Sequence, residues 1–236
     1  MIESLRLPPR LPREGAREYA IRMLKYNIVR LHLPPGTMIS AAELAESTGI
    51  SRTPFREAMQ ELAKSDILEI YPQAGSRVSY IDYEKIHEAR FIRMALETAV
   101  IEQACERITP EACLDLEDLL QLQENSLSRG DSDTLLELDD QFHQYLFALA
   151  GKRYTYQIME GVLVHFDRVR RLSLSALSEL RIVADHRKVF EAVRRRDKAT
   201  AVGLLTEHLS RYLEDEKIIR ATYTEYFADE TPAHGV

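Results

Sequence analysis

The sequence predicts a mainly α-helical protein, in which an N-terminal winged helix-turn-helix is followed by an antiparallel all-α helical bundle. Residues 40–65 have the pattern of two short helices joined by a tight turn. Residues 67–81 follow as strand, turn and strand, which places a β-hairpin directly after the second helix. From residue 82 to about 222 the pattern is helical throughout. We therefore expect a winged-helix domain over residues 14–80 and a helical domain over residues 81–222.

The helices of the predicted winged helix have recognisable ends. Residues 14–31 carry apolar side chains at helical spacing, and residues 34–36, Pro-Pro-Gly, stop that helix sharply. Ser40 and Glu43 form a capping box at the start of the next helix. Gly49 stands at its end, where a left-handed residue is favoured. The residues before the first helix, 1–13, lack periodicity, and we expect them to form a disordered arm.

The third helix has the character of a DNA-reading helix. Its apolar residues recur at helical spacing and face the core: Phe55, Ala58, Met59 and Leu62. The residues that project away from that core are the candidate DNA-binding residues: Ser51, Arg52, Thr53, Arg56 and Gln60. A recognition helix presents its N-terminal residues to base edges in the major groove, where arginine can bind guanine or phosphate. An ordinary surface helix with solvated arginines is the alternative, and the hairpin that follows, in the position of a wing, favours DNA binding.

Composition narrows the class of protein. The chain has 236 residues and a net charge of −7, but residues 1–80 hold 11 Lys and Arg against 9 Asp and Glu. The acidic excess therefore lies in the rest of the chain, as expected if only the N-terminal part contacts DNA. The two cysteines provide neither a disulfide framework nor a Cys-rich zinc site, so a reducing cytoplasm is the expected location. No apolar run approaches the length of a membrane span, and we expect no membrane association.

The helical domain divides into segments at capping and breaking residues. We expect helices over residues 82–107, 110–130, 131–150, 151–174, 178–196 and 197–222, the fifth beginning at Ser178 or Glu179. Residues 223–236 follow as a flexible tail. Short connections between successive helices favour an antiparallel bundle.

Three histidines and one aspartate of this domain are candidate metal ligands. Asp139 and His143 are four residues apart and share an apolar helix face. His186 and His208 lie on the apolar faces of two other predicted helices. A lone buried histidine is usually satisfied within the core, but four such groups are costly to bury unless they share a partner. A divalent cation is that partner, and three imidazoles with one carboxylate suit zinc, with nickel or manganese as alternatives.

The N-terminal motifs resemble those of GntR-type bacterial transcription regulators. The resemblance covers residues 14–80 and includes residues 33–36 (Leu-Pro-Pro-Gly), residues 43–45 (Glu-Leu-Ala) and the run Ser51-Arg-Thr-Pro-Phe-Arg-Glu-Ala58. It implies that Arg52, Thr53, Arg56 and the wing glycine, Gly75, lie at the DNA. The family often has Glu-Arg where this chain has Ala41-Ala42, so one customary arginine contact is missing.

The helical domain is similar to the ligand-binding domain of the FadR branch of that family. Three segments carry the likeness: residues 139–143, 185–192 and 207–209. The resemblance implies a metal held by Asp139, His143, His186 and His208, and a small carboxylate beside it. It also implies that Arg93, within residues 93–97 (Arg-Met-Ala-Leu-Glu), faces the cavity and binds the effector carboxylate, with a surface salt bridge to Glu97 as the alternative. Arg90 and Arg168 are further candidates for that role.

The function expected from these features is a metabolite-responsive regulator, most simply a repressor, that binds a double-stranded operator as a homodimer. A metal beside an arginine favours a polar anion, so a sugar acid or a short organic acid is the expected effector. A metal-sensing regulator without an organic effector is one alternative, and a metal-dependent hydrolase is another. Against the hydrolase, four protein ligands leave few open coordination positions, and no H-E-x-x-H motif is present.

Overall fold

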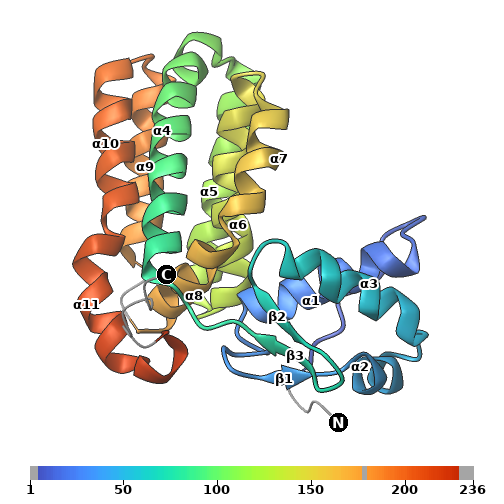
Figure 1. The fold of residues 1–236 in the computed structure, drawn as a ribbon. Helices are drawn as coiled ribbons and strands as arrows, with labels where there is room; N and C mark the ends of the chain where they lie inside the picture. Colours follow the sequence, from blue (N-terminus) through green and yellow to red (C-terminus); the bar gives the residue numbers. More distant parts are fainter. Residues whose placement is uncertain (1–4, 177–179, 229–236) are drawn as a thin grey trace.

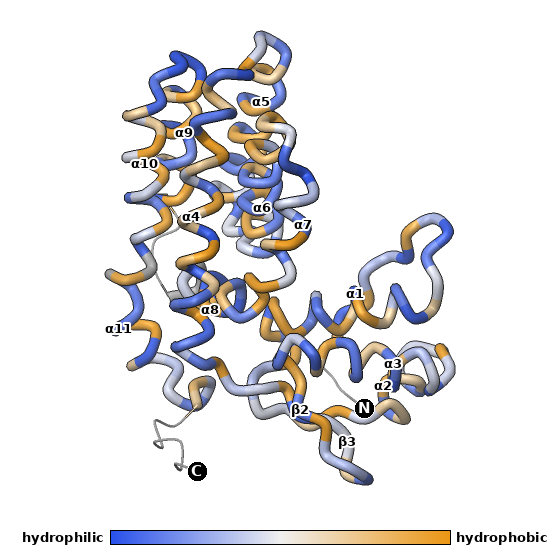
Figure 2. Tube along the Cα trace, turned by 45° about the horizontal axis from the view of Figure 1, so that its top comes forward, coloured by the Kyte–Doolittle hydropathy of each residue, from blue (hydrophilic) through white to orange (hydrophobic). Residues whose placement is uncertain are grey.

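A computed structural model describes residues 5–176 and 180–228 of the chain. A winged helix and a taller bundle of helices lie side by side, with helix α8 at the base of the bundle (Figure 1). Along the bundle helices, hydrophobic and hydrophilic residues alternate in short stretches, which is the amphipathic pattern from which they were predicted (Figure 2). None of the helices within the described ranges combines the length and the apolar character that a membrane crossing requires.

The winged helix consists of three helices and a small antiparallel sheet. Its helices are α1 (Ala16–Val29), α2 (Ala41–Thr48) and α3 (Arg52–Ala63), and its strands are β1 (Met38–Ile39), β2 (Leu68–Tyr71) and β3 (Gly75–Val78). The strand order is β1-β3-β2, and Leu68 pairs with Val78 in the hairpin. β1, a strand of only two residues, was not predicted from the sequence.

Local chemistry explains the helix-turn-helix. The Ser40 hydroxyl accepts a hydrogen bond from the Glu43 backbone N–H, as a capping box requires. Gly49 ends α2 with φ +72°, a left-handed conformation that glycine adopts without strain. Ser51 occupies the N-cap of α3, although its side chain makes no capping hydrogen bond. The apolar face of α3 is buried, as predicted, through Phe55, Ala58, Met59 and Leu62.

The helical domain begins with three helices whose ends agree with the sequence prediction. These are α4 (Tyr83–Arg107), α5 (Pro110–Ser128) and α6 (Ser132–Leu149). The side chains of Asp82, Thr109 and Asp131 each accept a backbone N–H at the start of these helices. The remaining elements are α7 (Arg153–Val162), α8 (Val164–Ala176), α9 (Leu180–Arg194), α10 (Lys198–Ser210), α11 (Tyr212–Thr222) and a 3₁₀ turn, Thr224–Tyr226.

Two helices that the sequence predicted as continuous are broken. The segment 151–174 forms α7 and α8, which are separated at Leu163, and the segment 197–222 forms α10 and α11, which are separated at Arg211. Gly161 lowers the helix propensity just before the first break. The break allows Val164 to join the buried core of the winged helix while Phe166 joins the core of the bundle. The expected start of the fifth helix, at Ser178 or Glu179, lies outside the described residues.

Both ends of the described chain pack against the fold, in contrast to the expected arm and tail. The Arg6 backbone N–H donates to Asn27 Oδ1 at 2.7 Å, and the Asn27 amide donates back to the Arg6 carbonyl at 2.8 Å. At the other end, the Ala228 N–H donates to the Ile81 carbonyl, and the Phe227 ring stacks on Tyr83 at 4.8 Å. A buried asparagine thus holds Arg6, and an aromatic pair and a backbone hydrogen bond hold Phe227 and Ala228. Residues 1–4 and 229–236 lie outside the described part.

Candidate metal centre and DNA-binding surface

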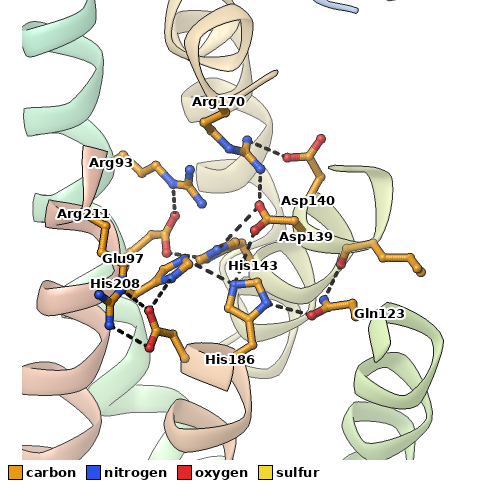
Figure 3. A network of polar contacts seen from close by, with 12 residues as sticks. Arg93, Glu97, Gln123, Asp139, Asp140, His143, Arg170, His186, His208 and Arg211 are labelled. Atoms are coloured by element: carbon orange, nitrogen blue, oxygen red, sulfur yellow. Dashed lines mark hydrogen bonds and ion pairs between the residues drawn. The ribbon is translucent and has the colours of Figure 1, made fainter. Parts of the chain in front are cut away.

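The four predicted metal ligands converge between three helices. Asp139 and His143 come from α6, His186 from α9 and His208 from α10, and one ligand atom from each lies within 4.8 Å of the others. In Figure 3 the three imidazoles and the Asp139 carboxylate face a common centre. All four are largely shielded from solvent, and His186 is completely buried.

The short distances at this centre join Nε2 atoms and carboxylate oxygens. His186 Nε2 lies 3.2 Å from His208 Nε2 and 3.4 Å from Asp139 Oδ1. His143 Nε2 lies 3.9 Å from Asp139 Oδ2 and has no hydrogen-bond partner among the described residues. A buried nitrogen without a partner is unfavourable by about 1–3 kcal/mol. His143 Nε2 is therefore an electron-pair donor for which the described residues supply no proton.

A second layer of side chains faces the opposite nitrogen of each imidazole. Glu97 Oε2 lies 2.6 Å from His143 Nδ1, and Gln123 Oε1 lies 2.9 Å from His186 Nδ1. Asp185 Oδ2 lies 3.8 Å from His208 Nδ1. An acceptor at Nδ1 of His143 and of His186 holds the proton there, which leaves their Nε2 lone pairs free for a metal; His208 Nδ1 has no partner at hydrogen-bond distance among the described residues. The sequence analysis assigned no role to these three residues.

The electrostatics favour the neutral form of His143 and His186 and the charged form of Glu97 and Asp139. Burial lowers the pKa of His186 well below its usual value, and the neighbouring His208 lowers it further. Burial also lowers the pKa of His143, although Glu97 opposes that shift. Burial alone would raise the pKa of Glu97, but His143 and Arg93 outweigh it and hold that pKa at about 2. Burial would likewise raise the pKa of Asp139, but Arg170 and His186 hold it below its usual value.

These donors fit a divalent transition-metal ion. Zinc in proteins takes four ligands in tetrahedral geometry and accepts histidine nitrogens and carboxylate oxygens, which this cluster combines in a ratio of three to one. The unpartnered Nε2 of His143 and the acceptors behind Nδ1 of His143 and His186 are features expected of such a site.

Among the arginines predicted to bind an effector, Arg93 lies beside the cluster. Its Nε donates to Glu97 Oε1 at 2.6 Å, and only 4% of the residue is exposed. The pair is therefore buried, not the surface salt bridge that was the alternative. Arg90 lies three residues before Arg93 on α4, where it donates to the Ser210 hydroxyl at 3.3 Å.

Arg168, another candidate for that role, makes its hydrogen bonds away from the cluster. Its Nη1 donates to the Ser79 carbonyl at 2.6 Å, and its Nη2 donates to His165 Nδ1 at 2.9 Å, at the boundary with the winged helix. Arg170, for which the sequence predicted no role, lies at the cluster. It contacts Asp139 Oδ2 and donates to Asp140 Oδ1 at 2.8 Å. Residues two apart on a helix point about 200° apart, so Arg168 and Arg170 cannot serve the same face.

The candidate DNA-binding side chains share one exposed surface on α3. Ser51, Arg52, Thr53, Arg56 and Gln60 are all exposed, on the side opposite the buried apolar face. The backbone conformation at Gly75 explains why the wing has a glycine at this position. Gly75 has φ +106°, and a Cβ at this position would lie 2.7 Å from the Ile39 carbonyl oxygen, so a larger residue would disturb the sheet.

Comparisons with known proteins agree with this architecture. Residues 17–78 match the bacterial regulatory proteins of the gntR family, and residues 88–211 match the FCD domain. The chain is 32% identical over 220 residues to the transcriptional repressor RspR of Escherichia coli K12, covering 93% of this chain and 96% of the repressor. This chain is a GntR-family transcriptional regulator with an FCD domain.

Other relatives of this GntR-family regulator are also regulators and not enzymes, so the hydrolase alternative is set aside. A transcriptional regulator of Streptomyces ambofaciens is 34% identical, covering 87% of this chain and 86% of its own. The gluconate operon repressor of Bacillus subtilis is 27% identical, covering 78% of both. The structure of E. coli McbR/YncC shares the fold, with a TM-score of 0.77, 22% identity and coverage of 89% of this chain and 99% of its own.

His165, at the boundary between the two domains of the GntR-family regulator, should make the stability of the protein depend on pH. Burial, followed by the charge of Arg168, lowers the pKa of His165 to about 4, whereas unfolded histidine has a pKa of about 6.5. Between these values the unfolded chain binds a proton that the folded chain does not. The free energy of unfolding should therefore fall by about 1 kcal/mol from pH 7 to 5.5 on account of this residue.

Denaturant unfolding of the wild type and of His165→Gln at both pH values measures that contribution. Asp66, Lys85 and Arg168 influence the same imidazole and are present in both proteins, so the difference isolates His165. Equal losses of stability in the two proteins would show that His165 takes up its proton in the folded state.

Proposed function

We propose that this regulator is a repressor whose operator affinity depends on a divalent metal and a small carboxylate effector held in the FCD domain. The observation that carries the proposal is the convergence of Asp139, His143, His186 and His208, with a hydrogen-bond acceptor behind two of the three imidazoles, those of His143 and His186. A zinc ion at this cluster would supply positive charge and, by expanding its coordination, a position for a carboxylate oxygen. Nickel and manganese are the alternatives to zinc.

The arginines around the cluster support an anionic effector. Arg93 and Arg170 reach toward it from α4 and α8, and each is paired with carboxylates of the protein. A ligand carboxylate can replace one of these partners and form a bidentate hydrogen-bonded pair. Arg90 is a further candidate, close to α10. Sugar acids and short organic acids suit this polar, charged centre, and one relative is named for a gluconate operon.

The winged helix supports operator recognition by Arg52, Thr53 and Arg56, with Ser51 and Gln60 beside them. GntR regulators bind operators typically as dimers, and two-fold symmetric operators match a homodimer. An effector changes operator affinity only if it binds the two arrangements of the protein with different affinities. Couplings of this kind usually change affinity by about 5- to 150-fold.

The test combines metal analysis with operator titration. Chelator-stripped protein is expected to take up one zinc per chain, and a panel of sugar acids and short organic acids is then screened for effects on operator Kd. We expect at least one acid to weaken operator binding about five-fold or more in the zinc-loaded protein only. If zinc alone produces the full effect and no acid adds to it, the protein is a metal sensor. If neither changes operator Kd, the proposal is wrong.

The second layer gives a prediction about Gln123. Gln123→Leu removes the acceptor at His186 Nδ1 while keeping the side chain's size, so zinc affinity should fall by about 10- to 100-fold. Gln121→Leu, an exposed change on the same helix, is the control. Competition with a chelating dye measures both affinities. A Gln123→Leu affinity within two-fold of the control would show that this hydrogen bond does not orient the ligand.

A further inference from the structure

The first turn of α8 is built into the winged helix. Val164 belongs to the buried core of that domain, together with residues of α1 and α3. His165 Nε2 lies 2.9 Å from the carbonyl oxygen of Ser65, which comes just after Lys64, the C-cap of the recognition helix α3. Arg168 donates to the carbonyl oxygen of Ser79, which directly follows the wing strand β3, at 2.6 Å. α8 therefore holds main-chain atoms at the ends of both DNA-contacting elements.

These interdomain hydrogen bonds form a connected, buried set. The low pKa of His165 keeps its imidazole neutral near pH 7, so Nε2–H donates to Ser65 and Nδ1 accepts from Arg168. Both side chains are at least nine-tenths buried. Hydrogen bonds that involve a buried charged group contribute about 1.5–3 kcal/mol each. Because breaking this contact is therefore costly, a displacement of α8 should move the winged-helix backbone with it.

The next turn of α8 contacts the candidate metal centre. Arg170 contacts the Asp139 carboxylate and donates to Asp140 Oδ1 and Asp167 Oδ1, each at 2.8 Å. Only one residue separates it from Arg168. One short helical segment thus touches a predicted metal ligand on one side and the winged-helix backbone on the other (Figures 1 and 3).

α8 is not the only link between the domains: Arg30 at the end of α1 pairs with the exposed Glu137 of α6 at 2.6 Å, and a further route runs through α4. α4 carries Arg93 and Glu97 near the cluster, and it reaches the winged helix through the chain connection and the ion pair of Lys85 with Asp66. Both side chains of that pair are more than a third exposed, and such surface pairs contribute about 0–1 kcal/mol. A cavity of about 350 Å³ lies at this seam, lined among others by Ser79, Lys85 and His165, and leaves room for a relative movement.

We propose that α8 couples occupancy of the metal centre to the placement of the winged helix, with Arg170 as the positioning residue and the His165–Arg168 pair as the interdomain contact. The inference rests on the proposed metal site. A cation bound by Asp139 competes with Arg170 for the charge of that carboxylate, and Asp140 and Asp167 then take a larger share of the guanidinium. The two arrangements of Arg170 give α8 two positions, each of which fixes a different placement of Ser65 and Ser79.

The experiment measures amide hydrogen exchange in full-length protein with zinc as the probe. In the wild type, saturating zinc should change exchange at residues 65–67 and 79–81 by about five-fold or more. In Arg168→Gln, zinc should still bind within about three-fold of wild-type affinity, but the change at these amides should fall below two-fold. Ser173→Ala is the matched control on α8, because Ser173 faces Asp215 of α11 and should leave the response intact.

Arg170→Gln provides a second test from the other end of the contact. At saturating zinc it should also lose the exchange response, whereas Arg170→Lys, which keeps a positive charge beside Asp139, should restore at least half of it. If zinc binds the wild type without changing exchange at these amides, or if Arg168→Gln responds like the wild type, the coupling through α8 is wrong and the metal site stands. If zinc does not bind the wild type, the proposed function is wrong and this inference falls with it.

Discussion

His186→Ala is expected to abolish stoichiometric zinc binding, with a loss of affinity of more than about 100-fold, while metal-free operator binding persists. His186 is the completely buried ligand, and its Nε2 lies closest to both His208 and Asp139. Removing it takes away one of four donors and also leaves Gln123 Oε1 without the imidazole proton. Changing an outer partner of a metal ligand already costs about 10- to 100-fold, so losing the ligand itself should cost more.

Two further variants serve as controls for the His186→Ala experiment. His87→Ala removes an exposed histidine outside the cluster and should leave zinc affinity unchanged. Because the His186 ring stacks on Phe142 at 4.2 Å, His186→Gln retains more of the packing and should give the same loss of zinc with less loss of stability. Atomic emission after gel filtration counts the zinc. A content of one per chain in either His186 variant would remove this residue from the site.

Arg52→Ala and Arg56→Ala are each expected to weaken operator binding by about 1–3 kcal/mol. Both side chains are exposed on the first turns of α3, and their pairing with base edges or phosphates would be lost in the variants. Salt dependence and sequence preference distinguish a phosphate contact from a base contact. Loss of a phosphate contact reduces the slope of log K against log salt by about 1, whereas loss of a guanine contact relaxes sequence preference.

The control for this experiment is an arginine far from the winged helix. Arg194 at the end of α9 is half exposed and pairs with Glu191, so Arg194→Ala changes net charge by the same amount. Fluorescence anisotropy with the operator and with a scrambled duplex gives both affinity and specificity. If the Arg52→Ala, Arg56→Ala double variant binds the operator as the Arg194→Ala protein does, α3 is not the DNA-reading surface.

The sequence was sufficient for features that depend on local chemistry. The capping residues Ser40, Asp82 and Asp131 marked helix starts, since their side chains satisfy backbone N–H groups within their own segment. The spacing of Asp139 and His143 placed both on one face of α6, because residues four apart on a helix are neighbours. The fold class and the convergence of the four candidate ligands followed from such patterns together with the family resemblance.

Features that depend on tertiary placement were not predictable. Gln123 is a single amide on an apolar helix face, and nothing local indicates that a histidine from α9 will meet it. Whether Arg168 or Arg170 faces the cluster depends on the break at Leu163, because the break sets the rotation of α8 about its own axis. The strand β1 is formed by pairing with β3, about 40 residues further along the chain, and two residues carry no strand signal of their own.

Zinc K-edge X-ray absorption on the zinc-loaded protein identifies the atoms that surround the bound ion. We expect one tightly bound zinc with nitrogen and oxygen neighbours at about 2.0–2.2 Å, and with the outer-ring scattering of three imidazoles. The same measurement on Gln123→Leu should keep those neighbours and show only a weaker affinity. A spectrum with sulfur at about 2.3 Å, or with fewer than two imidazoles, would contradict the assignment of Asp139, His143, His186 and His208 as the metal site.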